Sequence, residues 1–186
     1  MLTQSLFYFK NNMAKNCLNK LASSIAVGCT VSQVGVKDIY LMHAEDVTFT
    51  YSAAGIIQTA VFAGSAKSYK VEGYKQNIQV TAALKTTDVS ARMDTSVAFK
   101  VPYNTNTRAF INTVASGKFY VLVVFNDGDF TVLGDSSPLE CSSADFDSNA
   151  NAKMATITLA SPEGSAGNHA RVVTASAVST ITSKSI

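Results

Sequence analysis

The chain has 186 residues, a length that favours one domain with a sizeable core. Charged residues make up 15% of it, against about 25% in an ordinary soluble protein. The formal net charge is +2, and no cluster of Lys and Arg marks a duplex-DNA footprint. The exterior is therefore covered either by neutral polar side chains or by neighbouring subunits, and composition leaves both alternatives open.

Cysteine usage and apolar runs exclude some classes. Cys17, Cys29 and Cys141 are too few, and odd in number, for a disulfide scaffold, which favours a reducing compartment. No run of about 18 apolar residues is present, so no membrane-spanning helix and no membrane partner is predicted. Residues 21–29 (LASSIAVGC) imitate a lipoprotein signal ending at Cys29. Two serines interrupt its short apolar part, so a lipid anchor is the less favoured interpretation.

The first 30 residues are predicted to be an N-terminal extension with a short helix, and residues 31–186 a single β-rich domain. In the extension, apolar residues recur at helical spacing between Met13 and Ile25, with Asn12 as a possible cap. The pattern then turns to strands. Three are predicted, over residues 36–42, 46–51 and 55–63.

Residues 68–85 and 88–101 predict two long strands joined around 85–88. Both arms are apolar on one face and polar on the other. The apolar face carries Tyr74, Ile78, Val80, Ala82 and Leu84 on the first arm and Met93, Val97, Phe99 and Val101 on the second. The polar face carries Lys75, Asn77, Gln79 and Thr81, then Arg92, Asp94, Ser96 and Lys100. Such a ribbon covers the core of its own chain or joins other copies around a water-filled bore.

A helix is predicted near residues 105–117, where Thr105 or Thr107 can cap the start and Gly117 the end. The next strand, residues 119–125, is apolar on both faces and should lie centrally. Asp127-Gly128 predicts a tight hairpin back into residues 130–133.

Beyond this hairpin the sequence is locally acidic and predicts a loop at a rim or outer surface. The acidic residues are Asp127, Asp129, Asp135, Glu140, Asp145 and Asp147. Strands over residues 154–161 and 170–181 complete an antiparallel set. The predicted fold is mainly β, an antiparallel β-barrel or sandwich with one or two flanking α-helices and a long β-hairpin.

Catalytic motifs are absent from the sequence. His43 and His169 lie far apart, and no G-x-S-x-G, H-E-x-x-H, C-x-x-C or phosphate-binding glycine loop occurs. Cys141 has no neighbouring His that would activate it as a nucleophile. The sequence therefore predicts no enzyme and no cofactor.

One string resembles a calcium loop. Asp145, Asp147 and Asn149 occupy its first, third and fifth positions. Ala150 stands where the turn needs glycine, and Thr156 where the bidentate Glu belongs. An Asx-rich turn is the favoured interpretation, so no metal site is predicted.

The order of these features resembles a known family. A long ribbon, a helix near TRAFINTVASG, a strong strand, a D-G hairpin running into LG, and then DFDSN and ATITLASPEG resemble the tail-tube (major tail) proteins of long-tailed phages. The resemblance spans about residues 40–173. Residues 16–29 (NCLNKLASSIAVGC), with GVKDIYL after them, also look like proteins from phages of gut Bacteroidetes.

The resemblance implies a virion protein, assembled in the host cytoplasm into hexameric rings that stack as a tube for DNA passage. Its partners would be its own copies, other phage tail proteins and, transiently, DNA. On that basis the ribbon residues Tyr74, Ile78, Val80, Met93, Val97, Phe99 and Val101 would pair between subunits. Lys75, Gln79, Arg92 and Asp94 would line the bore, although such bores are usually acidic and these residues carry mixed signs.

Other functions remain open. A neck, ring or capsid-decoration role is the nearest alternative. A β-sandwich binding module at a bacterial surface, anchored at Cys29, belongs to a different class. A hydrolase would need His43 or His169 within reach of a carboxylate in a pocket.

Overall fold

The computed structural model describes residues 35–73, 77–86, 91–146, 153–163 and 170–186. The chain divides into two units, Met1–Gln33 and Val34–Ile186, and all described residues belong to the second. The predicted N-terminal helix lies outside the described residues, as do Cys17, Cys29, Tyr74, Lys75, Asp147, Asn149, Ala150 and His169.

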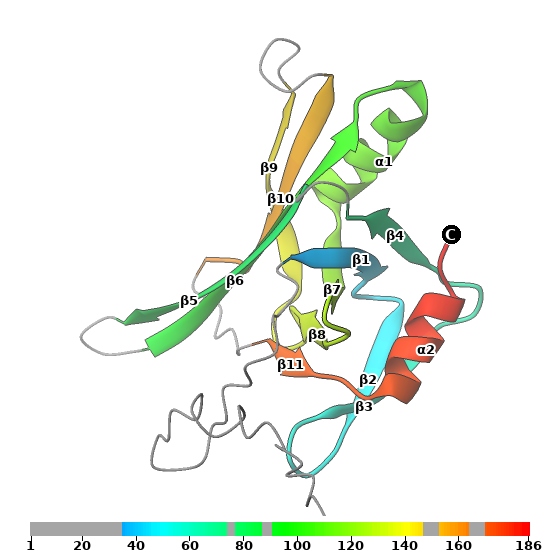
Figure 1. The fold of residues 1–186 in the computed structure, drawn as a ribbon, viewed down its shortest axis with the longest axis vertical. Helices are drawn as coiled ribbons and strands as arrows, with labels where there is room; N and C mark the ends of the chain where they lie inside the picture. The colour runs from blue at the N-terminus through cyan, green and yellow to red at the C-terminus, as the bar shows by residue number, and fades with distance from the viewer. Residues whose placement is uncertain (1–34, 74–76, 87–90, 147–152, 164–169) are drawn as a thin grey trace, which may run out of the picture. The chain divides into compact units, whose positions relative to one another are not determined.

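The described residues form eleven strands and two helices, so the chain is mainly β, as predicted (Figure 1). The strands are β1 (Val36–His43), β2 (Val47–Tyr51), β3 (Ile57–Phe62), β4 (Ser68–Glu72), β5 (Ile78–Thr86), β6 (Ala91–Pro102), β7 (Lys118–Phe125), β8 (Phe130–Leu133), β9 (Leu139–Phe146), β10 (Met154–Ala160) and β11 (Arg171–Val172). The helices are α1 (Thr105–Ser116) and α2 (Ala175–Ser183).

Nine strands form one sheet whose main path is β11-β8-β7-β9-β10-β6-β5. β1 pairs with β7 and with β4, and β2 and β3 form a separate two-stranded sheet. All of these named strand pairs are antiparallel. The path ends at β5 and β11, so no closed barrel forms among the described strands.

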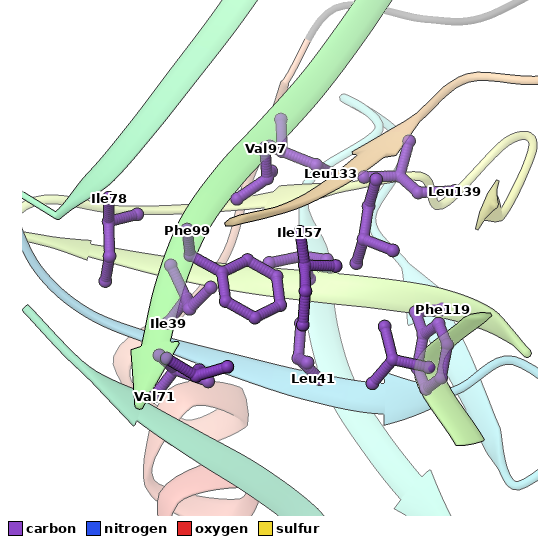
Figure 2. Packing of buried hydrophobic residues seen from close by; sticks show 14 of the residues in the cluster. Ile39, Leu41, Val71, Ile78, Val97, Phe99, Phe119, Leu133, Leu139 and Ile157 are labelled. Carbon is purple, nitrogen blue, oxygen red and sulfur yellow. The ribbon is translucent and has the colours of Figure 1, made fainter. Parts of the chain in front are cut away.

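β7 lies between two cores, which confirms the predicted central strand. Phe119, Val121 and Val123 belong to a first core with side chains of β1, β6, β10 and α1. Figure 2 shows part of this core, in which Phe119 lies with residues of β1, β6 and β10. Leu122 belongs to a second core with side chains of β2, β3 and α2. Successive strand residues point to opposite faces, so a strand apolar at every position can be covered on both sides.

The turn after β7 also forms where it was predicted. Gly128 has φ of 92°, a backbone conformation that favours glycine. The Asp127 carboxylate accepts a hydrogen bond from the Asp129 N–H at 3.1 Å, and the Asp129 carbonyl accepts one from Phe125 N–H at 2.9 Å. The chain then returns as β8.

The predicted strand over residues 68–85 is wrong, because the chain forms two strands there. β4 pairs with β1, whereas β5 pairs with β6. Gly73 follows β4, and its N–H donates to the Lys37 carbonyl at 2.7 Å. A Cβ at this position would lie 2.3 Å from that oxygen, so only glycine fits so close to β1. This long-range contact ends the first arm.

The predicted strand over residues 170–181 is wrong beyond Val172, because residues 175–183 form α2. The Thr174 side chain accepts a hydrogen bond from the Ala177 N–H and caps the helix. Ala177, Val178 and Ile181 are buried in the second core. Their spacing is that of one helix face, which outweighs the strand preference of the β-branched residues.

Two further boundaries differ from prediction. Asn104, not Thr105 or Thr107, caps α1: its side-chain oxygen accepts from the Thr107 N–H at 3.1 Å, and the Thr107 hydroxyl accepts from the Asn104 N–H at 3.1 Å. The predicted acidic loop contains β9, which pairs with β10 from Phe146 to Glu140. Its small polar residues form a strand because β10 supplies the partner edge.

Candidate assembly surface

The hairpin of β5 and β6 continues past the end of β10. β10 pairs with β6 from Pro102 to Ser96, whereas the β5–β6 pairing continues to Thr86 and Ala91. We call residues 82–86 and 91–95 the distal ribbon; no third strand pairs with it within the described part of the chain. In Figure 1 the two green strands run side by side away from β9 and β10.

The two apolar faces predicted for this hairpin do lie together. Ile78 is opposite Phe99, Val80 opposite Val97, and Leu84 opposite Met93. Residues directly opposite each other in an antiparallel pair point to the same face. The faces read from the sequence are therefore confirmed.

Burial divides this apolar face into two parts. Ile78, Val97, Phe99 and Val101 lie in the first core of their own chain, so their side chains are not available to a neighbouring copy. Val80 and Met93 are half-buried. Leu84 is 62% exposed and is the main apolar side chain that the distal ribbon presents. The predicted contact residues thus mostly fix the base of the hairpin.

The polar face of the distal ribbon carries a compact charge cluster. Asp94 accepts ion pairs from Lys85 at 2.7 Å and from Arg92 at 3.1 Å. The hydrogen bond from Lys85, with the charge of Arg92, holds the pKa of Asp94 below its usual value. Two cations therefore share one carboxylate, and Glu163 lines the same hollow.

The rest of this polar face is largely neutral. The hydroxyls of Thr81 and Ser96 are hydrogen-bonded at 2.6 Å, and Gln79 is exposed beside them. Across β6, β10 and β9 the same face continues with small polar side chains and few charges. The register places Ala98, Thr158 and Ser143 in one row and Lys100, Thr156 and Asp145 in the next. Gln79, Arg92 and Asp94, expected to line a bore, are all on this face.

The outer edge of β5 is unpaired by any described strand. The Lys100 N–H donates to the Asn77 carbonyl at 3.1 Å, which makes these two residues a hydrogen-bonded antiparallel pair. Hydrogen-bonded and non-bonded pairs alternate along such a ladder. The backbone groups of Val80, Ala82 and Leu84 therefore point away from β6. Unpaired strand edges of this kind are templates for another strand.

Two of the acidic residues after the β7–β8 hairpin form ion pairs within the chain. Asp135 pairs with Arg171 at 2.5 Å, and Glu140 pairs with Lys118 at 2.9 Å. Asp145 is exposed at the end of β9 and has no ion pair among the described residues. The sequence identified the acidity of this region but not these partners, because each cation comes from a distant segment or the adjoining strand.

His43 lies against the rings of Phe119 and Tyr69, with ring centroids 4.7 and 5.9 Å away. Glu45 and Asp46 line a groove beside it. Among the described residues, however, no carboxylate forms an ion pair with His43. The imidazole–carboxylate pair that a hydrolase would need is therefore not formed by these residues.

Cys141 is a half-buried free thiol that donates to the Ser143 carbonyl at 3.3 Å. Burial raises the pKa of this thiol, which disfavours the reactive thiolate. Within the described ranges, no group of three or more His, Cys, Asp or Glu side chains is arranged to hold a metal ion. Neither helix of this part of the chain is long and apolar enough to cross a bilayer.

Comparison with models of protein families, with curated proteins and with solved structures found no match for this chain.

Proposed function

We propose that the protein is a virion structural protein whose copies join through the free edge of β5 into rings, which stack as a phage tail tube for DNA passage. The observation that carries the proposal is a two-stranded ribbon that extends beyond the sheet, with an outer edge that no described strand pairs with and an exposed Leu84. The order of sequence features that resembles tail-tube proteins also supports it. A neck or other ring role in the same virion is compatible with the same contact.

Pairing between copies removes a liability that this edge would otherwise have. Natural edge strands are usually short, or interrupted by proline, bulges or inward-pointing charges. β5 has nine residues, contains no proline, and carries its one charge at Lys85 near the tip. A neighbouring strand would satisfy the outward backbone groups of Val80, Ala82 and Leu84. Repetition of such a contact around a closed rotation gives a ring.

The polar face of β5, β6, β10 and β9 has the character that a DNA conduit needs. A wall rich in Lys and Arg would bind phosphates by releasing counterions and would hold the DNA in place. This face instead carries mainly Thr, Ser and Ala; the two cations of the distal ribbon share Asp94, and Lys100 and Asp145 are charges of opposite sign in one row. We propose that it lines the bore.

The test changes one backbone donor on the free edge. In Ala82→Pro the outward N–H is removed, while the β5–β6 hydrogen bonds of the neighbouring residues remain. Ala82→Val is the matched control, because it adds bulk and keeps the N–H. Val97 and Phe99 are unsuitable targets, since both are 0% exposed and polar substitutions there would unfold the core.

Light scattering and electron microscopy of the full chain give the readout, with circular dichroism to show that each variant is folded. We expect rings or tubes from the parent protein and from Ala82→Val, and mostly monomers from Ala82→Pro. A parent protein that stays monomeric at high concentration would overturn the proposal. Assembly of folded Ala82→Pro equal to that of the parent would exclude the β5 edge as the contact.

A further inference from the structure

An apolar cavity of about 200 Å³ lies between α1 and the strands β1, β4 and β7. Its deepest lining residues are Leu41, Val114 and Phe119, which are buried in the first core. The other lining residues are His43, Tyr69, Ala109, Phe110 and Thr113. An apolar cavity of about 150 Å³ holds a benzene-sized molecule, so this one is large enough for a small organic group.

Four of the lining residues carry aromatic rings, and each comes from a different element. His43 ends β1, Tyr69 is in β4, Phe110 is in α1 and Phe119 is in β7. The His43 ring contacts the rings of Phe119 and Tyr69, with centroids 4.7 and 5.9 Å away. The faces of aromatic rings carry negative charge density, and rings arranged around a cavity are how proteins hold quaternary ammonium groups. Within the described part of the chain, no Lys or Arg lines this cavity.

The cavity shares His43 with a wider groove, and this groove is negatively charged. Glu45 and Asp46 line the groove, and neither forms an ion pair among the described residues. Lys118 also lines it, but the Lys118 ammonium is paired with the Glu140 carboxylate at 2.9 Å. Three carboxylates therefore accompany one ammonium at the mouth of the cavity, and negative charge is in excess.

The C-terminal end of α1 adds to this negative potential. Ser116 is the last residue of the helix, and both Ser116 and Gly117 line the groove. The carbonyl groups at a helix C-terminus carry a partial negative charge, which favours a cation near the last turn. The last turn of α1 contains no basic residue of its own. The rings of the cavity and the charges of the groove thus favour the same kind of ligand, an apolar group that carries a positive charge.

We infer that this cavity binds a small organic cation, a quaternary ammonium whose methyl groups lie among the four rings and whose charge faces the groove of Glu45 and Asp46. The rest of the ligand lies in the groove, where the two carboxylates repel a phosphate. The ligand is therefore of the choline type, without an anionic group, and not a phosphocholine headgroup. The site is separate from the β5 edge, so this inference does not depend on the proposed function.

A pair of ligands of equal shape tests the role of the charge. Choline is the cation, and 3,3-dimethylbutan-1-ol is its neutral counterpart, with a carbon atom in place of the nitrogen. Isothermal titration calorimetry of the full chain measures the affinity for each. We expect saturable binding of choline and at least about tenfold weaker binding of the neutral alcohol. Phosphocholine should also bind less tightly than choline.

A matched pair of substitutions on α1 tests the location. Ala109→Leu places a larger side chain in the cavity from an exposed position of the helix. Ala115→Leu is the control, because it makes the same change at an exposed position of α1 that does not line the cavity. We expect Ala109→Leu to weaken choline binding at least about tenfold, and Ala115→Leu to leave it unchanged. Glu45→Gln should weaken choline binding by about two- to fivefold and leave that of the alcohol unchanged.

Circular dichroism of each variant shows that it is folded before its affinity is compared. No saturable binding of choline by the parent protein would overturn the inference. Equal affinities for choline and the neutral alcohol would do the same, because the cavity would then select apolar groups without regard to charge. Choline binding by folded Ala109→Leu equal to that of the parent would place the ligand elsewhere and refute this site.

Discussion

The Nε of Arg171 donates a hydrogen bond to Oδ2 of Asp135 at 2.5 Å, and this pair connects three segments of the fold. Arg171 is in β11, Asp135 follows β8, and the Arg171 Nη1 also donates to the Gly55 carbonyl at 3.1 Å, in the turn between β2 and β3. The Tyr51 ring lies 5.4 Å from the guanidinium carbon. The hydrogen bond that Arg171 donates to Asp135 raises the pKa of Arg171, so the cation persists at any practical pH.

We expect Asp135→Asn to lower the free energy of unfolding by about 3 kcal/mol. The Asp135 side chain is only 4% exposed, and its replacement leaves the Arg171 guanidinium without an anionic partner. Urea denaturation followed by circular dichroism measures the loss. Asp129→Asn, at an exposed position of the β7–β8 turn, is the control and should change stability by less than about 0.5 kcal/mol. Equal stability of the two variants would contradict the structural role of the pair.

The charge cluster of the distal ribbon should make stability depend on pH in acid. Lys85 and Arg92 lower the pKa of Asp94 from 3.8, so its ionised form stabilises the folded state. The contribution is fully present above the unfolded pKa and is lost as the pH falls through the lower, folded value. The stability difference between the parent protein and Asp94→Asn should therefore be greatest near neutral pH and vanish in strong acid. Urea midpoints measured across that range test this, and a difference independent of pH would contradict it.

Gly73→Ala should be destabilising for steric reasons. The added Cβ would lie 2.3 Å from the Lys37 carbonyl oxygen and 2.5 Å from that of Val36, both backbone atoms of β1. Relief of such a clash requires the two strands to separate, at a cost of about 2 kcal/mol. Gly64→Ala is the comparison: nothing lies within 4 Å of its Cβ, so only the strain of its φ of +52° remains, about 1 kcal/mol. Thermal unfolding should rank Gly73→Ala as the less stable variant.

The cap of α2 offers a test of the helix that the sequence did not predict. The Thr174 hydroxyl accepts from the Ala177 N–H at 3.4 Å and donates to the Gln58 carbonyl at 2.9 Å. We expect Thr174→Ala to cost about 1 kcal/mol. Thr180→Ala, which removes a hydroxyl bonded to the Ser176 carbonyl within the helix, should be neutral or slightly stabilising. Chemical denaturation of both variants decides between these expectations, and equal losses would contradict the cap.

The pattern of adjacent residues was enough to predict the elements that depend least on contacts with distant parts of the chain. The strict alternation of Ile78, Val80 and Leu84 against Phe99, Val97 and Met93 predicted the two faces of the ribbon. Asp127-Gly128 predicted the turn between β7 and β8. The unbroken apolar run of β7 predicted a strand covered on both sides. In each case the side-chain period or a positive φ is a property of a few adjacent residues.

Contacts between distant residues decided the rest. The sequence of residues 68–85 favours one continuous strand. Gly73, however, lies close to the backbone of β1, and the chain there forms two strands, β4 paired with β1 and β5 paired with β6. Residues 175–183 carry β-branched side chains that favour a strand. They form a helix instead, because a helix places Ala177, Val178 and Ile181 on one face, where the second core buries them. Burial of Val97 and Phe99, and exposure of Leu84, likewise depend on where β10 ends. The sequence by itself determined which side chains share a face. Only the tertiary structure decided which of those faces is covered, because coverage is set by elements that are far away along the chain.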